Sequence, residues 1–588
     1  MSTHNPVAIA VSPLDEAFAR YVERLVLQHS HSASIAELLR CTALLTSAER
    51  AQGHSCVELP VYAERTIVLG ETSFAAPGLE NWESLLRQSG VCTSTYSAGT
   101  ADDRAPSLFV LHDSRLYLAR YFAAESRVAT AIRTRVAQVA PVSAPDLEVQ
   151  FAALFPKAAT QEDWQAIATQ AALDRSLTFI TGGPGTGKTT VAARILALLL
   201  HADPSLTVAI AAPTGRAAAR LVESIGAAAE REQLSDAVRR QLPTTGATLH
   251  RLLGYQPWTE TFRYGPGNAL PHDVIVIDEA SMVDILMMDA LFSALRPDAR
   301  VVILGDPDQL ASVDTGFVLG DVVRAAHAAP ATAPLAQSVV RLRHSWRFGS
   351  QPGIGALASA LQQGAVNEAR DVLTDATYDD VSMESWSAAA LQRSIEEPLD
   401  TLLRTQTPVE ALDALARFRV LAATREGPRG VQGVNLLIER MLARRGLAHT
   451  GWYAHRPVLI TANDPATNLF NGDVGVVFQD DTRMSVHFLQ PDGSVRALAP
   501  SRLPAHETAW AMTIHKSQGS EFDQVLLVMP EQDVPILTRE LLYTGVTRAK
   551  RRVTLFGDHA ILATGVQRTV GRTSGLVNQL LAPSTATG

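Results

Sequence analysis

Residues 177–190 read LTFITGGPGTGKTT, and this stretch decides the fold. The apolar run 177–181 is typical of a buried strand, and a helical run follows the glycine-rich turn as far as Leu200. The turn has the pattern GxxxxGK[ST], in which backbone N–H groups close around phosphate oxygens at a helix start. The residues predicted to bind ATP here are Gly182, Gly183, Pro184, Gly185, Thr186, Gly187, Lys188, Thr189 and Thr190.

Two side chains of this turn have predicted chemical roles. Lys188 is expected to reach the β- and γ-phosphates and to act in catalysis, and the Thr189 hydroxyl is expected to ligate Mg²⁺. Three further apolar runs, 207–212, 274–277 and 301–304, also end in polar loops. This layout predicts a doubly wound parallel sheet, in which ligands gather at the carboxyl ends of the strands.

The loops after two of these strands carry the predicted hydrolytic groups. Asp278 would hold Mg²⁺, and Glu279 would take the proton from the water that attacks the γ-phosphate. Gln309, in the loop after 301–304, would sense the γ-phosphate. The alternative for the acidic pair is helix capping.

Bulk composition limits the possible classes of protein. The 588 residues favour about four folding units, and the net charge of −9 restricts nucleic-acid contact to a local groove. The N-terminus has no signal-peptide pattern and no window is apolar enough to cross a bilayer, so the sequence predicts a cytoplasmic protein without a membrane contact. Cys41, Cys56 and Cys92 are predicted to be buried apolar residues.

Lysine is rare in this chain. Only Lys157, Lys188, Lys516 and Lys550 occur among 51 basic residues, so a lysine marks a position that favours a compact ammonium. The residues two positions before them are Phe155, Thr186, Ile514 and Arg548. None is acidic, so the acidic-x-Lys pair of metal-dependent nucleases is missing and no nuclease centre is predicted in this chain.

Several motifs in order resemble those of superfamily 1 helicases, and specifically the RecD (exonuclease V alpha chain) family. They are GGPGTGKTT, APTGRAAARL, TLHRLLG, VIDEASMVD, GDPDQLASV, TIHKSQGSEFD and YTGVTRAK, and the resemblance covers about residues 110–580. It implies two RecA-like domains around ATP and single-stranded nucleic acid. Two positions depart from the family pattern: Arg216 stands where lysine is common, and Trp346 where tyrosine is common.

The resemblance implies further roles near the nucleotide. Gln165 would read adenine, Gln518 and Gly519 would lie near the γ-phosphate, and Glu521 would lie near the ribose. Arg347 and Arg548 would reach across the domain gap to stabilise charge in the transition state. The alternatives are an exposed helical glutamine for Gln165 and surface salt bridges for the two arginines.

By the same resemblance, a second set of residues lines the single-strand track. Hydroxyls, imidazoles and cations suit phosphates and sugars, so binding should tolerate any sequence and weaken with salt. Local capping or packing is the alternative for each of them. The set is Thr214, Arg216, Thr248, His250, Thr513, His515 and Lys516.

The predicted fold class is α/β, with two RecA-like doubly wound parallel-sheet motor domains, an inserted small β-barrel and a helical N-terminal domain. The predicted boundaries are 1–110 for the N-terminal domain, 111–340 for the first motor domain, 341–452 with 505–588 for the second, and 453–504 for the barrel. A hairpin near 254–273 would either split duplex DNA or serve as a connector. The N-terminal domain would either dock on partners or only stabilise the motor.

The function expected from the resemblance is that of a 5′–3′ ATP-dependent DNA helicase subunit in an exonuclease V complex of the RecBCD type. Such a complex acts in double-strand break repair and recombination. The expected cofactors are ATP and Mg²⁺, and the expected partners are RecB-like and RecC-like subunits, single-stranded DNA and the ends of double-stranded DNA. The alternatives are a free-standing RecD-like helicase and an ATP-gated scaffold that does not translocate.

Overall fold

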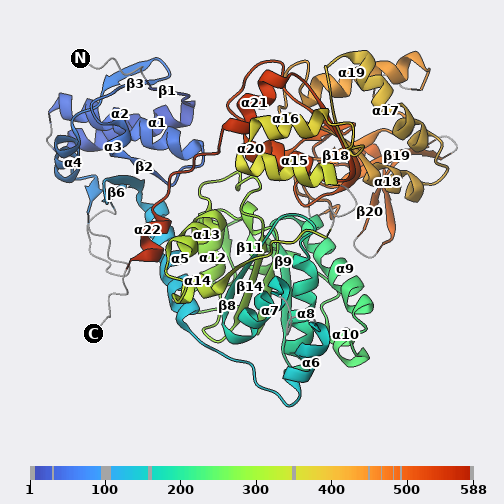
Figure 1. The fold of residues 1–588 in the computed structure, drawn as a ribbon. Coiled ribbons are helices and arrows are strands. Elements are labelled where there is room, and N and C mark those ends of the chain that lie inside the picture. Colours follow the sequence, from blue (N-terminus) through green and yellow to red (C-terminus); the bar gives the residue numbers. More distant parts are fainter. Residues whose placement is uncertain are drawn as a thin grey trace.

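The computed structural model describes residues 7–29, 32–94, 107–156, 162–346, 352–447, 451–464, 466–480, 483–490 and 493–582. These ranges form an N-terminal domain, two α/β domains with parallel sheets, and an antiparallel sheet inserted in the second α/β domain (Figure 1). The two α/β domains lie one above the other in Figure 1, and the N-terminal domain lies to one side of them. The predicted fold class is therefore confirmed in its main elements.

The first α/β domain is built on a sheet of six parallel strands. In spatial order the strands are β10 (Ala247–Thr248), β9 (Val208–Ala212), β13 (Val274–Ile277), β14 (Arg300–Gly305), β8 (Leu177–Thr181) and β15 (Val339–Arg341). The register pairs Thr181 with Gly305 and Ile277 with Ile303. Because these strands are parallel, the loops that follow them leave the sheet at one edge.

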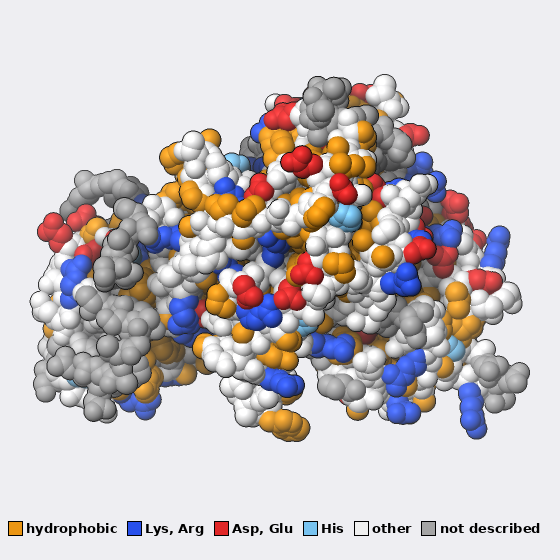
Figure 2. Space-filling view, turned by 90° about the horizontal axis from the view of Figure 1, so that it is seen from below, with side chains coloured by type: hydrophobic (Ala, Val, Ile, Leu, Met, Phe, Trp, Pro, Cys, Tyr) orange, Lys and Arg blue, Asp and Glu red, His pale blue; other side chains and the backbone are white. Residues whose placement is uncertain are grey.

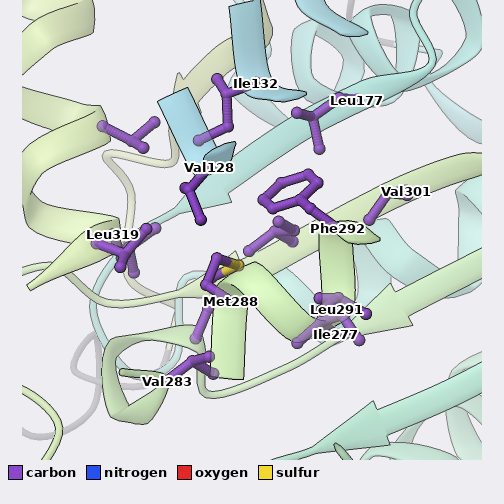
Figure 3. Close-up of a cluster of buried hydrophobic side chains, with 14 of the residues drawn as sticks. Val128, Ile132, Leu177, Ile277, Val283, Met288, Leu291, Phe292, Val301 and Leu319 are labelled. Atoms are coloured by element: carbon purple, nitrogen blue, oxygen red, sulfur yellow. The ribbon is translucent and has the colours of Figure 1, made fainter. Parts of the chain in front are cut away.

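Helices cover both faces of this sheet. On one face lie α8 (Lys188–Ala202) and α9 (Gly215–Arg231), and on the other lie α5 (Ala119–Ala137), α12 (Ile285–Ser293) and α13 (Val318–Ala328). Figure 3 shows Phe292 and Met288 of α12 packed between α5 and the strands. Burial of each such side chain contributes about 1.5–3 kcal/mol, so these layers hold the strand ends in fixed positions.

The second α/β domain has a sheet of five parallel strands. In spatial order they are β16 (Val381–Glu384), β25 (Ala549–Phe556), β24 (Phe522–Val528), β17 (Phe418–Ala422) and β23 (Ala511–Thr513). One face carries α15 (Pro352–Gln363), α16 (Val366–Thr374), α20 (Arg539–Val546) and α21 (His559–Gln567). The other carries α17 (Ala388–Leu403), α18 (Pro408–Arg417) and α19 (Val431–Arg444).

The insertion is an antiparallel sheet of five strands. Their spatial order is β21 (Val495–Leu498), β20 (Arg483–Leu489), β19 (Val474–Asp480), β18 (Pro457–Ile460) and β22 (His506–Thr508). Within the described ranges β21 and β22 are the two edges, so closure into a barrel is not confirmed. The insertion also reaches Thr508, because β22 pairs with β18 beyond the predicted end at residue 504.

The N-terminal domain differs from the helical prediction. Its helices α1 (Pro13–Gln28), α2 (Ala33–Ala51) and α4 (Leu79–Gln88) pack on two small sheets. One sheet has the order β1 (Val7–Ile9), β3 (Thr66–Leu69), β4 (Thr72–Ala75), and the other β2 (Cys56–Glu58), β7 (Arg115–Leu118), β6 (Phe109–His112), β5 (Cys92–Thr93).

This second sheet moves the domain boundary. The hairpin of β6 and β7 turns at Asp113 and Ser114, which both have positive φ, as a two-residue turn of type I′ requires. The predicted boundary at residue 110 falls inside β6, and the domain instead ends with β7 at Leu118, just before α5 begins at Ala119. All three cysteines are buried and unpaired as predicted, and burial raises the pKa of Cys41 to about 11.

The C-terminal segment does not stay in the second α/β domain. After α21 the chain crosses to the first domain, where α22 (Leu576–Leu581) packs against α5 and α13 (Figure 1). The guanidinium of Arg572 donates to the carbonyls of Asp314 at 2.6 Å and Gly316 at 2.8 Å. The predicted range 505–588 is therefore corrected, because its last described part completes the first domain.

The tail also closes a buried junction with the N-terminal domain. The Gly575 N–H donates to Glu125 Oε2 at 3.2 Å, and the Ser55 hydroxyl donates to Glu125 Oε1. Burial, opposed by these hydrogen bonds, raises the pKa of Glu125 from 4.5 to about 7.

We expect Glu125→Gln to raise the thermal stability of the protein at pH 8 more than at pH 5. A carboxyl with a higher pKa in the folded chain keeps its proton longer when folded, so wild-type stability falls as pH rises from about 4.5 to about 7. The glutamine amide does not ionise: its oxygen can accept from the Gly575 N–H, and its NH2 group can donate to the Ser55 oxygen, whose hydroxyl then donates to the Thr573 carbonyl. Thermal melts at pH 5, 6, 7 and 8 measure the effect, with Glu397→Gln on the exposed side of α17 as control. An equal shift at every pH would contradict this assignment.

Candidate functional site

The glycine-rich loop lies between β8 and α8, as predicted. Lys188 Nζ donates to the carbonyls of Gly182 at 2.6 Å and Gly183 at 3.1 Å, so the ammonium lies inside the loop. Gly187 has φ 89°, and a Cβ there would lie 2.3 Å from Gln165 Nε2. The N-terminus of a fifteen-residue helix opens at this point, which makes the loop suited to an anion.

Gln165 packs directly on this loop. Its Nε2 donates to the Thr186 carbonyl at 3.2 Å, and its Oε1 accepts from Arg194 at 3.1 Å. Arg194 also pairs with Glu232 at 3.0 Å, so the amide of Gln165 is held at both ends. The alternative of an ordinary exposed helical glutamine is thus not what the structure has.

The loop near residue 345 lies on the other side of the glycine-rich loop. The Trp346 N–H donates to the Gly185 carbonyl at 2.9 Å, and the Ser345 hydroxyl donates to the Pro184 carbonyl at 3.2 Å. The Trp346 side chain is 67% exposed beside the loop. Arg347, the next predicted residue, lies outside the described residues.

Asp278 and Glu279 follow β13 at the same edge of the sheet. Asp278 Oδ1 accepts the Glu279 N–H at 2.8 Å. Burial first, and then repulsion from Glu279, raise the pKa of Asp278 to about 6, whereas Lys188 and Arg220 act in the opposite direction. Glu279 has φ 53°, a strained conformation for a residue with a side chain, and such strain is concentrated at functional sites. The pair does not cap an α-helix, because only a three-residue 3₁₀ turn follows it.

The loop after β14 meets the second α/β domain. Gln309 is buried; its Nε2 donates to Asp306 Oδ2 at 3.0 Å, and its Oε1 accepts from Arg548 Nη2 at 2.8 Å. Tyr543 of α20 donates its hydroxyl to the same Asp306 oxygen at 2.9 Å. Hydrogen bonds therefore join the two α/β domains beside the glycine-rich loop.

Arg548 is buried in this contact and is not part of a surface salt bridge. Its other nitrogens donate to the carbonyls of Thr544 and Ser520, each at 3.2 Å. Gln518 Nε2 donates to the Leu310 carbonyl at 3.3 Å, and the neighbouring Gly519 lies close to Ala217 and Thr214. The structure thus brings Gln309, Gln518 and Arg548 together.

Glu521 pairs with one basic residue of the first α/β domain and one of its own domain. Its carboxylate accepts from Arg220 of α9 and lies 3.8 Å from Lys550 Nζ. Arg220 also lowers the pKa of Asp278 by its charge, so it lies between the acidic loop and the second domain. The predicted place of Glu521 near a ribose is not tested by these contacts.

The three threonines predicted for the single-strand track all cap local structure. Thr214 Oγ1 accepts from Ala217 N at 3.2 Å, and Thr248 Oγ1 accepts from Arg251 N at 3.2 Å. Thr513 Oγ1 accepts from Lys516 N at 3.3 Å. The local alternative is therefore realised, but each hydroxyl keeps its own proton for donation to another acceptor.

The other predicted track residues differ in charge. Burial lowers the pKa of His250 and of His515, which keeps both imidazoles neutral at pH 7. Lys516 Nζ pairs with Glu507 at 2.6 Å. Arg216 is exposed, and surrounding protein together with Arg220 lowers its pKa without removing its charge.

Three residues with a clear place in this site were missed by sequence reasoning: Asp306, Tyr543 and Arg220. All three lie inside motifs that were recognised, GDPDQ, YTGVTRAK and APTGRAAARL. Their charged or hydroxyl-bearing side chains within these motifs could have marked them as candidates. Their partners could not be inferred, because the Arg220–Glu521 and Tyr543–Asp306 contacts each join residues more than 200 positions apart in the chain.

Two domains with parallel sheets, joined by Gln309 and Arg548 beside a phosphate-binding loop, define the class of ATP-driven motors built from paired RecA-like domains. Family models match three parts of the chain. They are the N-terminal domain of the RecBCD enzyme subunit RecD over residues 9–117, an AAA domain over 165–315 and a UvrD-like helicase C-terminal domain over 508–556.

Curated relatives extend this match over most of the chain. The RecBCD enzyme subunit RecD of Mycolicibacterium smegmatis is 41% identical over 81% of this chain and 84% of its own length. That of Haemophilus influenzae is 30% identical over 96% of both chains. The chain belongs to the RecD family, and it is an ATP-dependent DNA helicase subunit.

Two further similarities cover less of this chain. The ATP-dependent RecD2 DNA helicase of Deinococcus radiodurans is 31% identical over 75% of this chain but only 55% of its own length. The solved structure of Bacteroides Pif1 bound to single-stranded DNA is 17% identical over 66% of this chain and 90% of that chain, with a TM-score of 0.36.

Proposed function

We propose that the chain is the 5′–3′ DNA translocase of a RecBCD-type complex that processes the ends of broken double-stranded DNA. The observation that carries this proposal is the hydrogen bond between Gln309 and Arg548. It joins the two α/β domains beside the glycine-rich loop, so a change at the γ-phosphate would alter the contact between the domains. Opening and closing of this contact would move the strand.

In this proposal the nucleotide site uses residues of both domains. Lys188 balances charge on the β- and γ-phosphates, and Glu279 accepts the proton of the attacking water. Gln309 senses the γ-phosphate, and Arg347 and Arg548 stabilise charge in the transition state. Gln165 reads adenine, Gln518 and Gly519 lie near the γ-phosphate, and Glu521 lies near the ribose. Each of these roles is assigned by the family motif.

Mg²⁺ is part of the same proposal. The Thr189 hydroxyl and the partly buried carboxylate of Asp278 would hold it, with the remaining ligands from phosphate oxygens and water. This donor set fits magnesium, which uses one or two carboxylates in nucleotide sites. Among the described residues no group of three or more His, Cys, Asp or Glu side chains is placed to hold a metal alone. A bound magnesium ion would offset charge on the phosphates.

DNA would bind along the track formed by Thr214, Arg216, Thr248, His250 and the 513–516 loop. These groups suit phosphates and sugars and cannot read base sequence. Basic and acidic side chains are interspersed over the face that Figure 2 shows, which fits a local groove rather than a broad positive field. No helix among the described ranges has both the length and the apolar character needed to span a membrane.

The hairpin of β11 (Tyr255–Gln256) and β12 (Thr261–Phe262) has two parts with different surroundings. At its base, Tyr255 and Phe262 pack around His250 with ring centroids 5.4 and 6.0 Å away. At its tip, Trp258 is 98% exposed. The base therefore lies against His250 of the predicted track, and both roles, a connector and separation of duplex strands by the tip, stay predictions.

The proposed partners are RecB-like and RecC-like subunits, since the Mycolicibacterium and Haemophilus relatives are named as RecBCD subunits and match over most of their lengths. The N-terminal domain is the proposed docking site. Because no acidic-x-Lys pair occurs in the chain, strand cutting is assigned to another subunit. The cytoplasmic location stays a prediction.

Unwinding assays with tailed duplexes test the proposal. The chain, alone and co-purified with the products of neighbouring genes, is given duplexes with either a 5′ or a 3′ single-stranded tail. We expect the complex to unwind from the 5′ tail through this subunit, and Lys188→Ala to remove that activity. Preference of this subunit for 3′ tails would overturn the polarity.

The same assay separates the two alternatives. Robust unwinding by the lone chain would favour a free-standing helicase, although the chain spans only about half of the RecD2 relative. ATP turnover that is slow with or without single-stranded DNA would favour an ATP-gated scaffold. A scaffold would also show equal turnover in wild type and in Lys188→Ala.

A further inference from the structure

Tyr543 is a buried phenol that no role assigned above uses. It lies on α20 of the second α/β domain, is 2% exposed, and donates its hydroxyl to Asp306 Oδ2 of the first domain at 2.9 Å. Burial and the negative charges of Asp306 and Asp308 hold the pKa of Tyr543 well above its usual range. The hydroxyl therefore keeps its proton and acts as a donor at every pH at which the protein would work.

The same hydroxyl lies against the glycine-rich loop. A Cβ on Gly183 would lie 2.9 Å from Tyr543 Oη, closer than such atoms approach in real structures. The carbonyl of Gly183 in turn accepts from Lys188 Nζ at 3.1 Å. One oxygen atom of the second domain therefore touches both the loop that holds Lys188 and the loop that holds Gln309.

Asp306 connects this hydroxyl to Gln309. Its Oδ2 accepts from both Tyr543 and Gln309 Nε2, and its Oδ1 accepts from the Asp308 N–H at 3.1 Å. The donor end of the Gln309 amide is thus fixed by Asp306, and its acceptor end is fixed by Arg548. Because an amide has one donor end and one acceptor end, these partners set its orientation.

The neighbour of Tyr543 reinforces the contact. Thr544 Oγ1 accepts from the Leu310 N–H at 3.0 Å, so two consecutive residues of α20 hold the 306–310 loop. A shift of α20 away from this loop by about one ångström would take both hydrogen bonds beyond their usual ranges, about 2.5–3.0 Å for O–H···O and about 2.7–3.2 Å for N–H···O, and so weaken them.

We propose that Tyr543 and Asp306 are positioning residues through which the position of the second α/β domain controls the orientation of the Gln309 side chain. In this contact the Tyr543 hydroxyl holds Asp306, and Asp306 together with Arg548 holds the Gln309 amide in one orientation. DNA binding that stabilises the packing of α20 on the 306–310 loop would keep Gln309 in place for the γ-phosphate. The inference rests on the proposed motor function and adds how DNA binding would stimulate hydrolysis. Neither residue touches the reacting atoms in this scheme.

Tyr543→Phe tests the inference because it removes one oxygen and keeps the ring. We expect DNA-stimulated kcat for ATP to fall on the order of 10-fold, since a hydrogen bond to a carboxylate is lost. The KM for ATP should change less than about twofold, because the loop residues that would contact the nucleotide are unchanged. Asp306→Asn should lower kcat by a similar factor. The double variant should lose no more kcat than the single variant with the larger loss, since both substitutions break the same hydrogen bond between Tyr543 and Asp306.

Two controls keep the result decisive. Tyr21→Phe removes a hydroxyl from an exposed tyrosine on α1 and should leave kcat unchanged. Thermal melts should show that every variant is folded. Three outcomes would each overturn the inference. They are a wild-type kcat in Tyr543→Phe, losses of kcat that multiply in the double variant, and a change in KM without a change in kcat. If DNA fails to stimulate the wild type, the proposed function fails, and the kcat ratio of variant to wild type without DNA still tests the positioning role.

Discussion

Lys188→Ala should lower ATP turnover by a factor on the order of 10² to 10³ with single-stranded DNA saturating, because the variant lacks the ammonium that lies inside the phosphate loop. Lys188 Nζ contacts two carbonyls of that loop, at 2.6 and 3.1 Å, so the charge is already placed where phosphate oxygens would bind. Steady-state phosphate release measures the effect.

Lys188→Arg makes this prediction sharper. Arginine replaces lysine almost everywhere in this chain, so the chain tolerates guanidinium groups widely. The planar fork is larger than an ammonium and cannot occupy the same point between the carbonyls of Gly182 and Gly183. We expect Lys188→Arg to be nearly as inactive as Lys188→Ala. Arg417→Ala, at an exposed arginine of α18, is the control, and turnover near the wild-type rate in either Lys188 variant would refute the assignment.

Glu279→Gln should stop hydrolysis while binding of ATP and DNA persists. The carboxylate is the proposed acceptor of the water proton, and loss of such a general base costs about 10²- to 10⁴-fold in rate. Its backbone is held at φ 53°, which fixes the direction in which the side chain leaves the strand end. Glutamine has nearly the same shape, so the positions of Asp278 and Lys188 should be unaffected.

Single-turnover hydrolysis and retention of labelled nucleotide distinguish the two steps. We expect the Glu279→Gln protein to retain ATP on single-stranded DNA without releasing phosphate. Glu397→Gln makes the same chemical change on the surface of α17 and should behave as wild type. Equal loss of nucleotide binding and of hydrolysis would instead assign Glu279 a structural role in the loop.

The α/β domains were predictable because their signals are local. Four of the six strands of the first domain, β8, β9, β13 and β14, are runs of apolar residues followed at once by a polar loop, and the phosphate loop fixes the order of strand, turn and helix. The two small sheets of the N-terminal domain carry no such signal. Strands such as β2 and β5 have three and two residues, and β2 pairs with β7 almost sixty positions away. The alternation of apolar and polar residues that is typical of a half-buried strand cannot be recognised over so few residues.

The candidate site was predictable for a similar reason, and only in part. Motifs name the residue types at each strand end, and parallel strands bring these ends together without further information. The contacts between domains depend on how α20 meets the 306–310 loop, which no local pattern encodes. Thr214 illustrates the remaining ambiguity, since the same hydroxyl caps α9 and has a proton to offer to a phosphate.

The return of the C-terminal segment to the first α/β domain has a consequence for synthesis on the ribosome. Helix α5 is complete after residue 137, but the face that α22 covers stays open until residues 576–581 have left the exit tunnel. Glu125 likewise lacks its Gly575 partner for most of translation. The first domain can therefore only finish folding after the second has been made, and its open apolar face is exposed to aggregation and to chaperones throughout that interval.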